Sequence, residues 1–194
     1  MAIEIYYTLE SDKSPRKWRD SDISCGGSMA IFMGFMWWME EKYLPSLPAP
    51  YGIKSDRYYS RSTASLSWAK GTGEHPMQEV WDLQLSPNAT HAERLTMASM
   101  MDRGYFLASD YPKIESAWLE VACAMNKKGV EEAFKCLIEA IYKVIREIPG
   151  IHSIAINWTS VVCFYESYGK TDKKCYDFVA DNAKVESQFT KTNV

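Results

Sequence analysis

The run from Met29 to Met39 contains only apolar and aromatic residues and one glycine. In a helix, these side chains would cover much of the circumference, which implies deep burial. Three prolines follow between positions 45 and 50, so the sequence predicts one buried helix from about Gly27 to Tyr43. The apolar run is too short to cross a bilayer, which takes about 20 residues, and no membrane span is expected.

The composition predicts one domain with a sizeable core. The chain has 194 residues, of which 46% are hydrophobic and 13% are aromatic, and such a chain has enough apolar material to fold. We expect a single domain over residues 1–183 and a flexible tail over residues 184–194. The net charge is -3 and the pI is near 5.7. Since the chain has no basic stripe, a nucleic-acid partner is not expected.

The cysteines have no metal-binding spacing. They are Cys25, Cys123, Cys136, Cys163 and Cys175. No C-x-x-C pair is present, so neither a metal nor another cofactor is expected. Cys123 and Cys136 fall on apolar faces of predicted helices, where we expect them to be buried. The odd number favours a reducing compartment, and the N-terminus does not have the pattern of a Sec signal peptide, so the expected localisation is cytoplasmic.

The hydrophobic periodicity predicts an α+β chain. The predicted strands are 3–8, 81–85, 151–156, 161–165 and 175–179, and the predicted helices after the first are 89–102, 112–125 and 130–148. Residues 10–24 are polar and charged and are expected to form a loop. This order places helices in the first three quarters of the chain and an antiparallel sheet at its end.

Cys25 is the leading candidate for a catalytic group. It stands directly ahead of the predicted buried helix, where the partial positive charge of a helix N-terminus favours a thiolate. A thiolate nucleophile also needs a base and a group that orients the base. His152 opens a predicted strand, and Glu166 ends the next strand, so both are candidates for these roles. Gly26 leaves the backbone approachable, so that an amide there could support an oxyanion.

Two regions of the chain carry a family resemblance. Ser24-Cys25-Gly26-Gly27-Ser28 precedes a Trp-bearing helix, and the His152–Ile156 segment is followed by 163–169 and 175–178. Together these segments resemble the nucleophile helix and the C-terminal sheet of papain-like cysteine peptidases of the YopT/AvrPphB type. The resemblance implies a papain-like fold, in which a nucleophile at a helix N-terminus packs on a C-terminal antiparallel sheet.

The same resemblance implies roles for individual residues. Cys25 would be the nucleophile, His152 the general base, and Glu166 would stand where the family has its catalytic aspartate. Upstream of Cys25 the sequence has Asp22 rather than a Gln or Asn that could donate to an oxyanion.

The expected activity is thiol-dependent acyl transfer on a protein substrate. A cysteine protease is the leading form, and deamidation or transglutamination would use the same acyl-thioester intermediate. The family resemblance implies an effector-like or toxin-like virulence role inside a host cell, reached by a secretion route other than Sec.

Two other functions stay open from the sequence alone. Asn157 followed by Phe164-Tyr165-Glu166-Ser167-Tyr168-Gly169 resembles the end of the GNAT acyltransferase fold, with residues 126–131 in place of its Gly-rich pyrophosphate turn. The third alternative is a catalytically degenerate peptidase fold that acts as a binding or inhibitory protein, with Tyr58, Tyr59 and Trp68 as candidate contacts.

Overall fold

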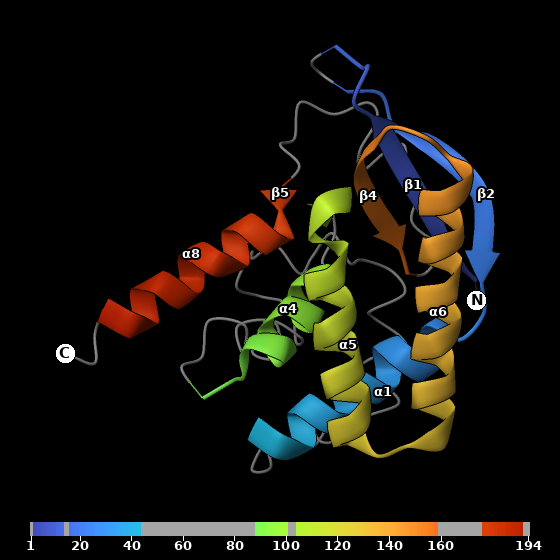
Figure 1. The fold of residues 1–194 in the computed structure, drawn as a ribbon. Coiled ribbons are helices and arrows are strands. Elements are labelled where there is room, and N and C mark those ends of the chain that lie inside the picture. Colours follow the sequence, from blue (N-terminus) through green and yellow to red (C-terminus); the bar gives the residue numbers. More distant parts are fainter. Residues whose placement is uncertain (1, 14–15, 44–87, 101–103, 159–175, 192–194) are drawn as a thin grey trace, which may run out of the picture.

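The computed structural model describes residues 2–13, 16–43, 88–100, 104–158 and 176–191. The elements in chain order are β1 (Ile3–Leu9), β2 (Arg19–Cys25), α1 (Ser28–Tyr43), α4 (His91–Ser99), β3 (Gly104–Leu107), the 3-10 helix η3 (Ala108–Asp110), α5 (Tyr111–Met125), α6 (Lys128–Glu147), β4 (Ile151–Asn157), β5 (Tyr176–Asp177) and α8 (Phe178–Lys191). This mixture of helices and strands confirms the predicted α+β class (Figure 1).

The strands form one five-stranded sheet in the order β2-β1-β4-β3-β5. The first four strands are antiparallel to their neighbours, and β5 joins β3 in parallel. The N-terminal strand β1 therefore lies between β2 and β4 near the middle of the sheet. The prediction of a helical first part on a C-terminal sheet is wrong in this respect, because both ends of the described chain contribute strands.

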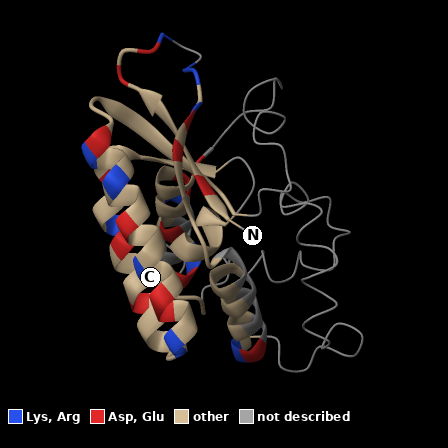
Figure 2. Cartoon of the chain, turned by 90° about the vertical axis from the view of Figure 1, so that its right-hand side faces the viewer, with Lys and Arg blue, Asp and Glu red and all other residues tan. Residues whose placement is uncertain are grey.

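The helices build the main core against one face of the sheet. Helix α6 packs on β1 and β2, while α1 and α5 pack against α6. Figures 1 and 2 show this helical layer on one side of the strands from two directions. Ile3 and Ile5 of β1 and Ile154 of β4 are fully buried in this core, together with Phe134 and Ile141 of α6. The alternation of β1 places its apolar side chains on this face.

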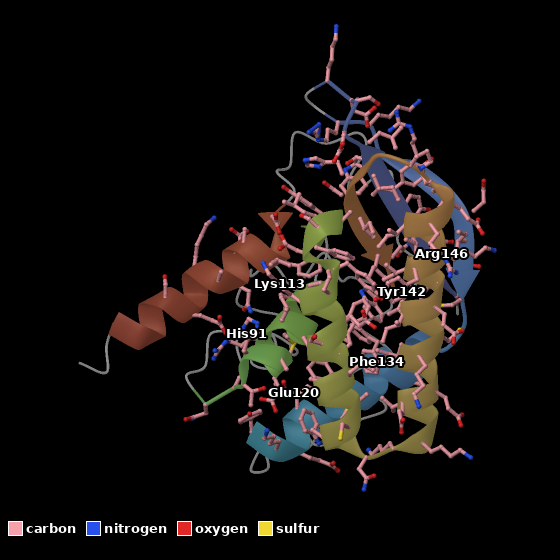
Figure 3. The ribbon with its side chains drawn as sticks, viewed as in Figure 1. His91, Lys113, Glu120, Phe134, Tyr142 and Arg146 are labelled. Atoms are coloured by element: carbon pink, nitrogen blue, oxygen red, sulfur yellow. The ribbon has the colours of Figure 1, made fainter. Side chains whose placement is uncertain are left out.

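Two buried tryptophans join the helical layer to the end of β4. The rings of Trp118 and Trp158 lie 6.3 Å apart in an edge-to-face arrangement. Ser99, the last residue of α4, satisfies both indoles: its Oγ accepts from Trp118 Nε1 at 3.3 Å and its carbonyl accepts from Trp158 Nε1 at 2.8 Å. Phe134 of α6, labelled in Figure 3, packs against Trp118 with ring centroids 6.1 Å apart. Burial of the indoles is favourable because both N–H donors have partners.

Local sequence explains where the helices begin and end. Thr90 and Glu93 form a capping box at the start of α4, which satisfies two backbone donors. Helix α5 begins after Asp110 with a proline in its first turn, as the sequence predicts, and ends at Asn126 in the left-handed conformation. Gly150, with φ +72°, turns the chain from α6 into β4.

Three parts of the secondary-structure prediction are wrong. Residues 19–24, predicted as loop, belong to the edge strand β2 (Arg19–Cys25), and residues 104–107 form β3, the next described element after α4. Residues 178–191 form α8, so the predicted strand at 175–179 is two residues long and the predicted tail from residue 184 is helical as far as Lys191. The predicted strand at 161–165 lies outside the described residues, as does the one at 81–85.

Charges of both signs are interspersed over the described helices (Figure 2). Helix α6, for example, carries ion pairs between Lys135 and Glu131 and between Lys128 and Glu132, each one turn apart. None of the helices in the described part of the chain is long and apolar enough to cross a membrane.

Candidate functional site

Cys25 is the last residue of β2, and Gly26 and Gly27 separate it from the first turn of α1. Its predicted place directly ahead of the buried helix is confirmed. Its cross-strand partner is Ile3 of β1, and only 8% of the residue is exposed. The side chain belongs to the main core, between the sheet and the helical layer.

The environment of Cys25 disfavours a thiolate. Burial raises the pKa of its thiol to about 12, and contact with the Cys136 thiol of α6 adds to the increase. The expectation that the start of α1 would favour the thiolate is therefore wrong, because loss of hydration outweighs the partial charge of the helix end. At neutral pH the group is a protonated thiol and a weak nucleophile.

His152 is the second residue of β4 and is half-buried. Its Nδ1 lies 2.6 Å from the Oγ of Ser153 and shares a hydrogen bond with it. The predicted strand at this position is confirmed, but the imidazole is engaged by its own neighbour in the strand.

Cys25 and His152 lie at opposite ends of the sheet. Cys25 is opposite Ile3, at the beginning of β1, whereas Ser153, next to His152, is opposite Thr8 near the end of β1. The distance between these two positions along β1 corresponds to about 17 Å. A base must lie within hydrogen-bond reach of its nucleophile, so the predicted pair of Cys25 and His152 is not formed.

The remaining predicted catalytic positions do not restore such a site. Glu166 lies outside the described residues. Asp22 is exposed, has a left-handed φ of 57° and donates its amide to Asp20 Oδ1 at 2.9 Å. Gly26 has no described atom within 4 Å of the place a Cβ would take, so its backbone is open on that side. The Cys25 thiol next to it is buried.

The segment predicted to replace a pyrophosphate turn joins two helices. Asn126 is the left-handed C-cap of α5, and α6 begins at Lys128. A phosphate-binding turn of the predicted kind leads from a strand into a helix, so this connection does not have that form. Residues 164–169 of the same pattern lie outside the described part of the chain.

Comparison with protein-family models, curated proteins and solved structures finds no match to this chain. Within the described residues, no three or more His, Cys, Asp and Glu side chains gather into a possible metal site. The function therefore has to follow from the geometry of the chain itself.

The second face of the sheet carries a fixed carboxylate. Glu4 of β1 is opposite Asn157 of β4, and Asn157 Nδ2 donates to Glu4 Oε2 at 2.9 Å. The hydroxyl of Tyr6 donates to the same oxygen at 3.2 Å. Both donors reach Oε2, so the carboxylate is oriented, and none of the side chains that the structure describes donates to Oε1.

Further aromatic side chains pack around Tyr6, which donates to this carboxylate. Tyr6 and Ala155 are buried in a second, smaller cluster, against which Trp18 and Tyr105 pack as half-buried residues. The rings of Trp18 and Tyr105 meet edge to face with centroids 6.0 Å apart. We call Glu4, Tyr6, Trp18, Tyr105 and Asn157 the acidic-aromatic cluster.

Asp20 of β2 adds a second negative charge beside this cluster. It is opposite Tyr6, and directly opposed residues project from the same face of a sheet. Asp20 is exposed. A fixed acid, an exposed acid and adjoining aromatic rings suit a cationic side chain, through charge pairing and cation–π contact.

The sequence contains only a weak signal for the acidic-aromatic cluster. Glu4 interrupts an otherwise apolar strand, and such an acid needs a polar partner. Its partner Asn157 is 153 residues away, and only the β1–β4 register identifies it. The candidate aromatic residues Tyr58, Tyr59 and Trp68 lie outside the described residues.

The prediction that Cys123 and Cys136 are buried is wrong, because both residues are exposed. Each lies at the boundary of the apolar face of its helix, where residues next to it are buried. Periodicity alone does not decide such boundary positions, because the width of the covered stripe depends on the neighbouring helix.

Proposed function

We propose that the protein is a non-catalytic binding protein, whose acidic-aromatic cluster takes a Lys or Arg side chain of a partner protein. The observation that carries the proposal is the Glu4 carboxylate, held by Tyr6 and Asn157, together with the edge-to-face pair of Trp18 and Tyr105 that packs against Tyr6. This corresponds to the third alternative from the sequence, a binding or inhibitory protein, without its assumption of a peptidase fold. Neither the papain-like arrangement nor acyl transfer through Cys25 is part of the proposal.

Pre-organisation of the carboxylate supports a binding role. Glu4 loses little additional side-chain freedom when a partner binds, because two hydrogen bonds already hold it in place. A cation that reaches Oε1 then gains a charge-assisted hydrogen bond. The register of β1 and β4 fixes these groups on adjacent strands rather than on a loop.

The aromatic residues supply the contact area. Trp and Tyr are enriched among the residues that dominate protein–protein binding energies, and they lose little conformational freedom on binding. Trp18 and Tyr105 are half-buried and support each other through their ring contact. Their π-faces and the carboxylate of Glu4 favour the same class of partner group, a guanidinium or ammonium.

The experiment identifies the partner and then measures its affinity. A photo-crosslinking amino acid is placed at the exposed Lys17, next to Trp18, and in a second sample at the exposed Leu119 of α5, as a control for the helical layer. A protein that is crosslinked from position 17 and not from position 119 is purified, and its Kd is measured by calorimetry.

Variants of the cluster then test the geometry. We expect Glu4→Gln and Trp18→Ala to weaken binding about tenfold to hundredfold, since each removes a central contact. Glu120→Gln, on the exposed face of α5 (Figure 3), makes the same charge change outside the cluster and should leave Kd unchanged. Cys25→Ala should also leave Kd unchanged. Equal crosslinking from both positions, or a Kd that Glu4→Gln does not alter, would refute the proposed role.

A further inference from the structure

Cys25 and Cys136 lie on two elements that pack together, β2 and α6. Cys25 ends the edge strand β2, and Cys136 lies in the third turn of α6, the helix that packs on β2. The Cys136 thiol lies close enough to the Cys25 thiol to contribute to the raised pKa of Cys25. The chain thus brings together two cysteines that are far apart in the sequence.

The backbones approach closely at the same place. A Cβ built on Gly27 would lie 2.8 Å from the Cβ of Ala133 and 3.5 Å from its Cα. Ala133 is three residues before Cys136, and residues at this spacing share a helix face. The junction after Cys25 therefore lies against the face of α6 that carries Cys136, and the backbones of the two elements approach closely beside the two cysteines.

The two cysteines differ in access. Cys136 is exposed and Cys25 is buried, so a reagent from solution meets Cys136 first. This asymmetry is typical of a thiol that is modified and a second thiol that resolves the modification.

We propose that Cys136 is a modification site for small-molecule disulfides, and that Cys25 resolves the mixed disulfide into an intramolecular Cys25–Cys136 bond. In the first step the Cys136 thiol loses its proton and its sulfur attacks the small disulfide. A mixed disulfide forms, and one small thiolate leaves and takes up a proton. In the second step Cys25 loses its proton, its sulfur attacks the Cys136 sulfur, and the second small thiolate leaves and takes up a proton. The thiolate fraction of Cys25 is small at neutral pH, but the step is intramolecular, and proximity to the Cys136 sulfur offsets this. Two protein thiols are oxidised, and one small disulfide is reduced to two small thiols.

The bond would fasten the edge strand to the helical layer. It closes a long segment of chain, and such cross-links stabilise mainly by restricting the unfolded state. We expect the oxidised protein to have a Tm about 5–10 °C above that of the reduced protein. Excess reduced glutathione should reverse the change.

The test uses the full chain and oxidised glutathione as the probe. Intact-mass spectrometry under non-reducing conditions should show the loss of two hydrogens and little lasting glutathione adduct at Cys136. Peptide mapping should find the bond between Cys25 and Cys136. In Cys25→Ala, the second step is impossible, and Cys136 should remain as the glutathione adduct.

Two further variants keep the result interpretable. Cys136→Ser, at an exposed position, should fold and leave Cys25 unmodified, because Cys25 is buried. Cys123→Ser, which removes the exposed cysteine of α5, should form the bond as the unmodified chain does. A glutathione adduct that persists on Cys136 equally in the unmodified chain and in Cys25→Ala would overturn the proposal, and so would a bond from Cys136 to any other cysteine.

Discussion

Gly27→Ala should destabilise the protein far more than alanine at either of two other glycines. Gly27 has φ +91°, and a Cβ at this position would lie 2.8 Å from the Cβ of Ala133. The neighbouring atom belongs to a short side chain on a helix, and it has no flexible end that can move away. Both the backbone conformation and the space therefore require glycine.

The loss of stability in Gly27→Ala can be divided into two parts. A left-handed backbone at a residue with a Cβ costs about 1–2 kcal/mol, and a clash in a well-packed core costs about 1–3 kcal/mol. We expect Gly27→Ala to lower the free energy of unfolding by about 2–5 kcal/mol in total. Gly150→Ala isolates the first part, because Gly150 has φ +72° but nothing within 4 Å of a Cβ. Gly26→Ala has neither problem and should change stability by less than about 1 kcal/mol.

Urea unfolding, followed by circular dichroism, measures the three variants. The expected order of stability is Gly26→Ala, then Gly150→Ala, then Gly27→Ala. Adding Ala133→Gly to Gly27→Ala should recover the part due to the clash, after allowance for about 1 kcal/mol for glycine in a helix. If Gly27→Ala costs no more than Gly150→Ala, the close approach of the β2–α1 junction to α6 is refuted.

Three more predictions concern buried polar groups and the thiol. Because the pKa of Cys25 is raised from near 9 to about 12, the unfolded chain loses this proton first as the pH rises. Stability should fall by about 1 kcal/mol between pH 8 and pH 10 in urea unfolding, and this part should vanish in Cys25→Ala. The Thr8 hydroxyl is buried and has no hydrogen-bond partner among the described residues, so Thr8→Val should raise the free energy of unfolding by about 1 kcal/mol, and a loss would contradict this. Burial disfavours the charge of Glu93, but hydrogen bonds from Lys42 and Tyr43 outweigh it and lower the pKa of Glu93. The stabilisation by ionised Glu93 is therefore present above the pKa that Glu93 has in the unfolded chain. It is lost as the pH falls through the lower pKa of Glu93 in the folded protein. Glu93→Gln should cost about 1–3 kcal/mol at pH 7, and much less at low pH.

Long amphipathic segments were predictable from the sequence alone. Helix α6 has apolar residues at helical spacing over its whole length, and α5 has a start signal in Asp110 and Pro112. Strands β1 and β4 are rich in isoleucine, and β4 is buried at every position except His152. In these segments the local pattern and the packing favour the same structure, which is the condition under which periodicity is reliable.

The edge strand β2 was not predictable from the sequence, because its local pattern and its structure do not agree. The β2 sequence is mostly polar because only one side of an edge strand is covered and its other side meets solvent. Its charged residues therefore resemble those of a loop. The partner of Glu4 was equally hidden, because strand register, rather than sequence spacing, brings Asn157 to it.

The residues around Cys25 fit both a catalytic motif and a tightly packed junction. A cysteine followed by two glycines at a helix start suits an exposed nucleophile, which needs an approachable backbone and a stabilised thiolate. The same residues suit a tight junction, and here Gly27 provides it, with a left-handed backbone against Ala133. That close approach brings α6 over Cys25 and removes water from its thiol, which raises its pKa. A catalytic thiol must be exposed, whereas a thiol in a packed junction is buried, so the two explanations predict opposite exposures for Cys25. Stability of the Gly27 variants and oxidation of Cys136 test the packing explanation through two independent properties of one contact.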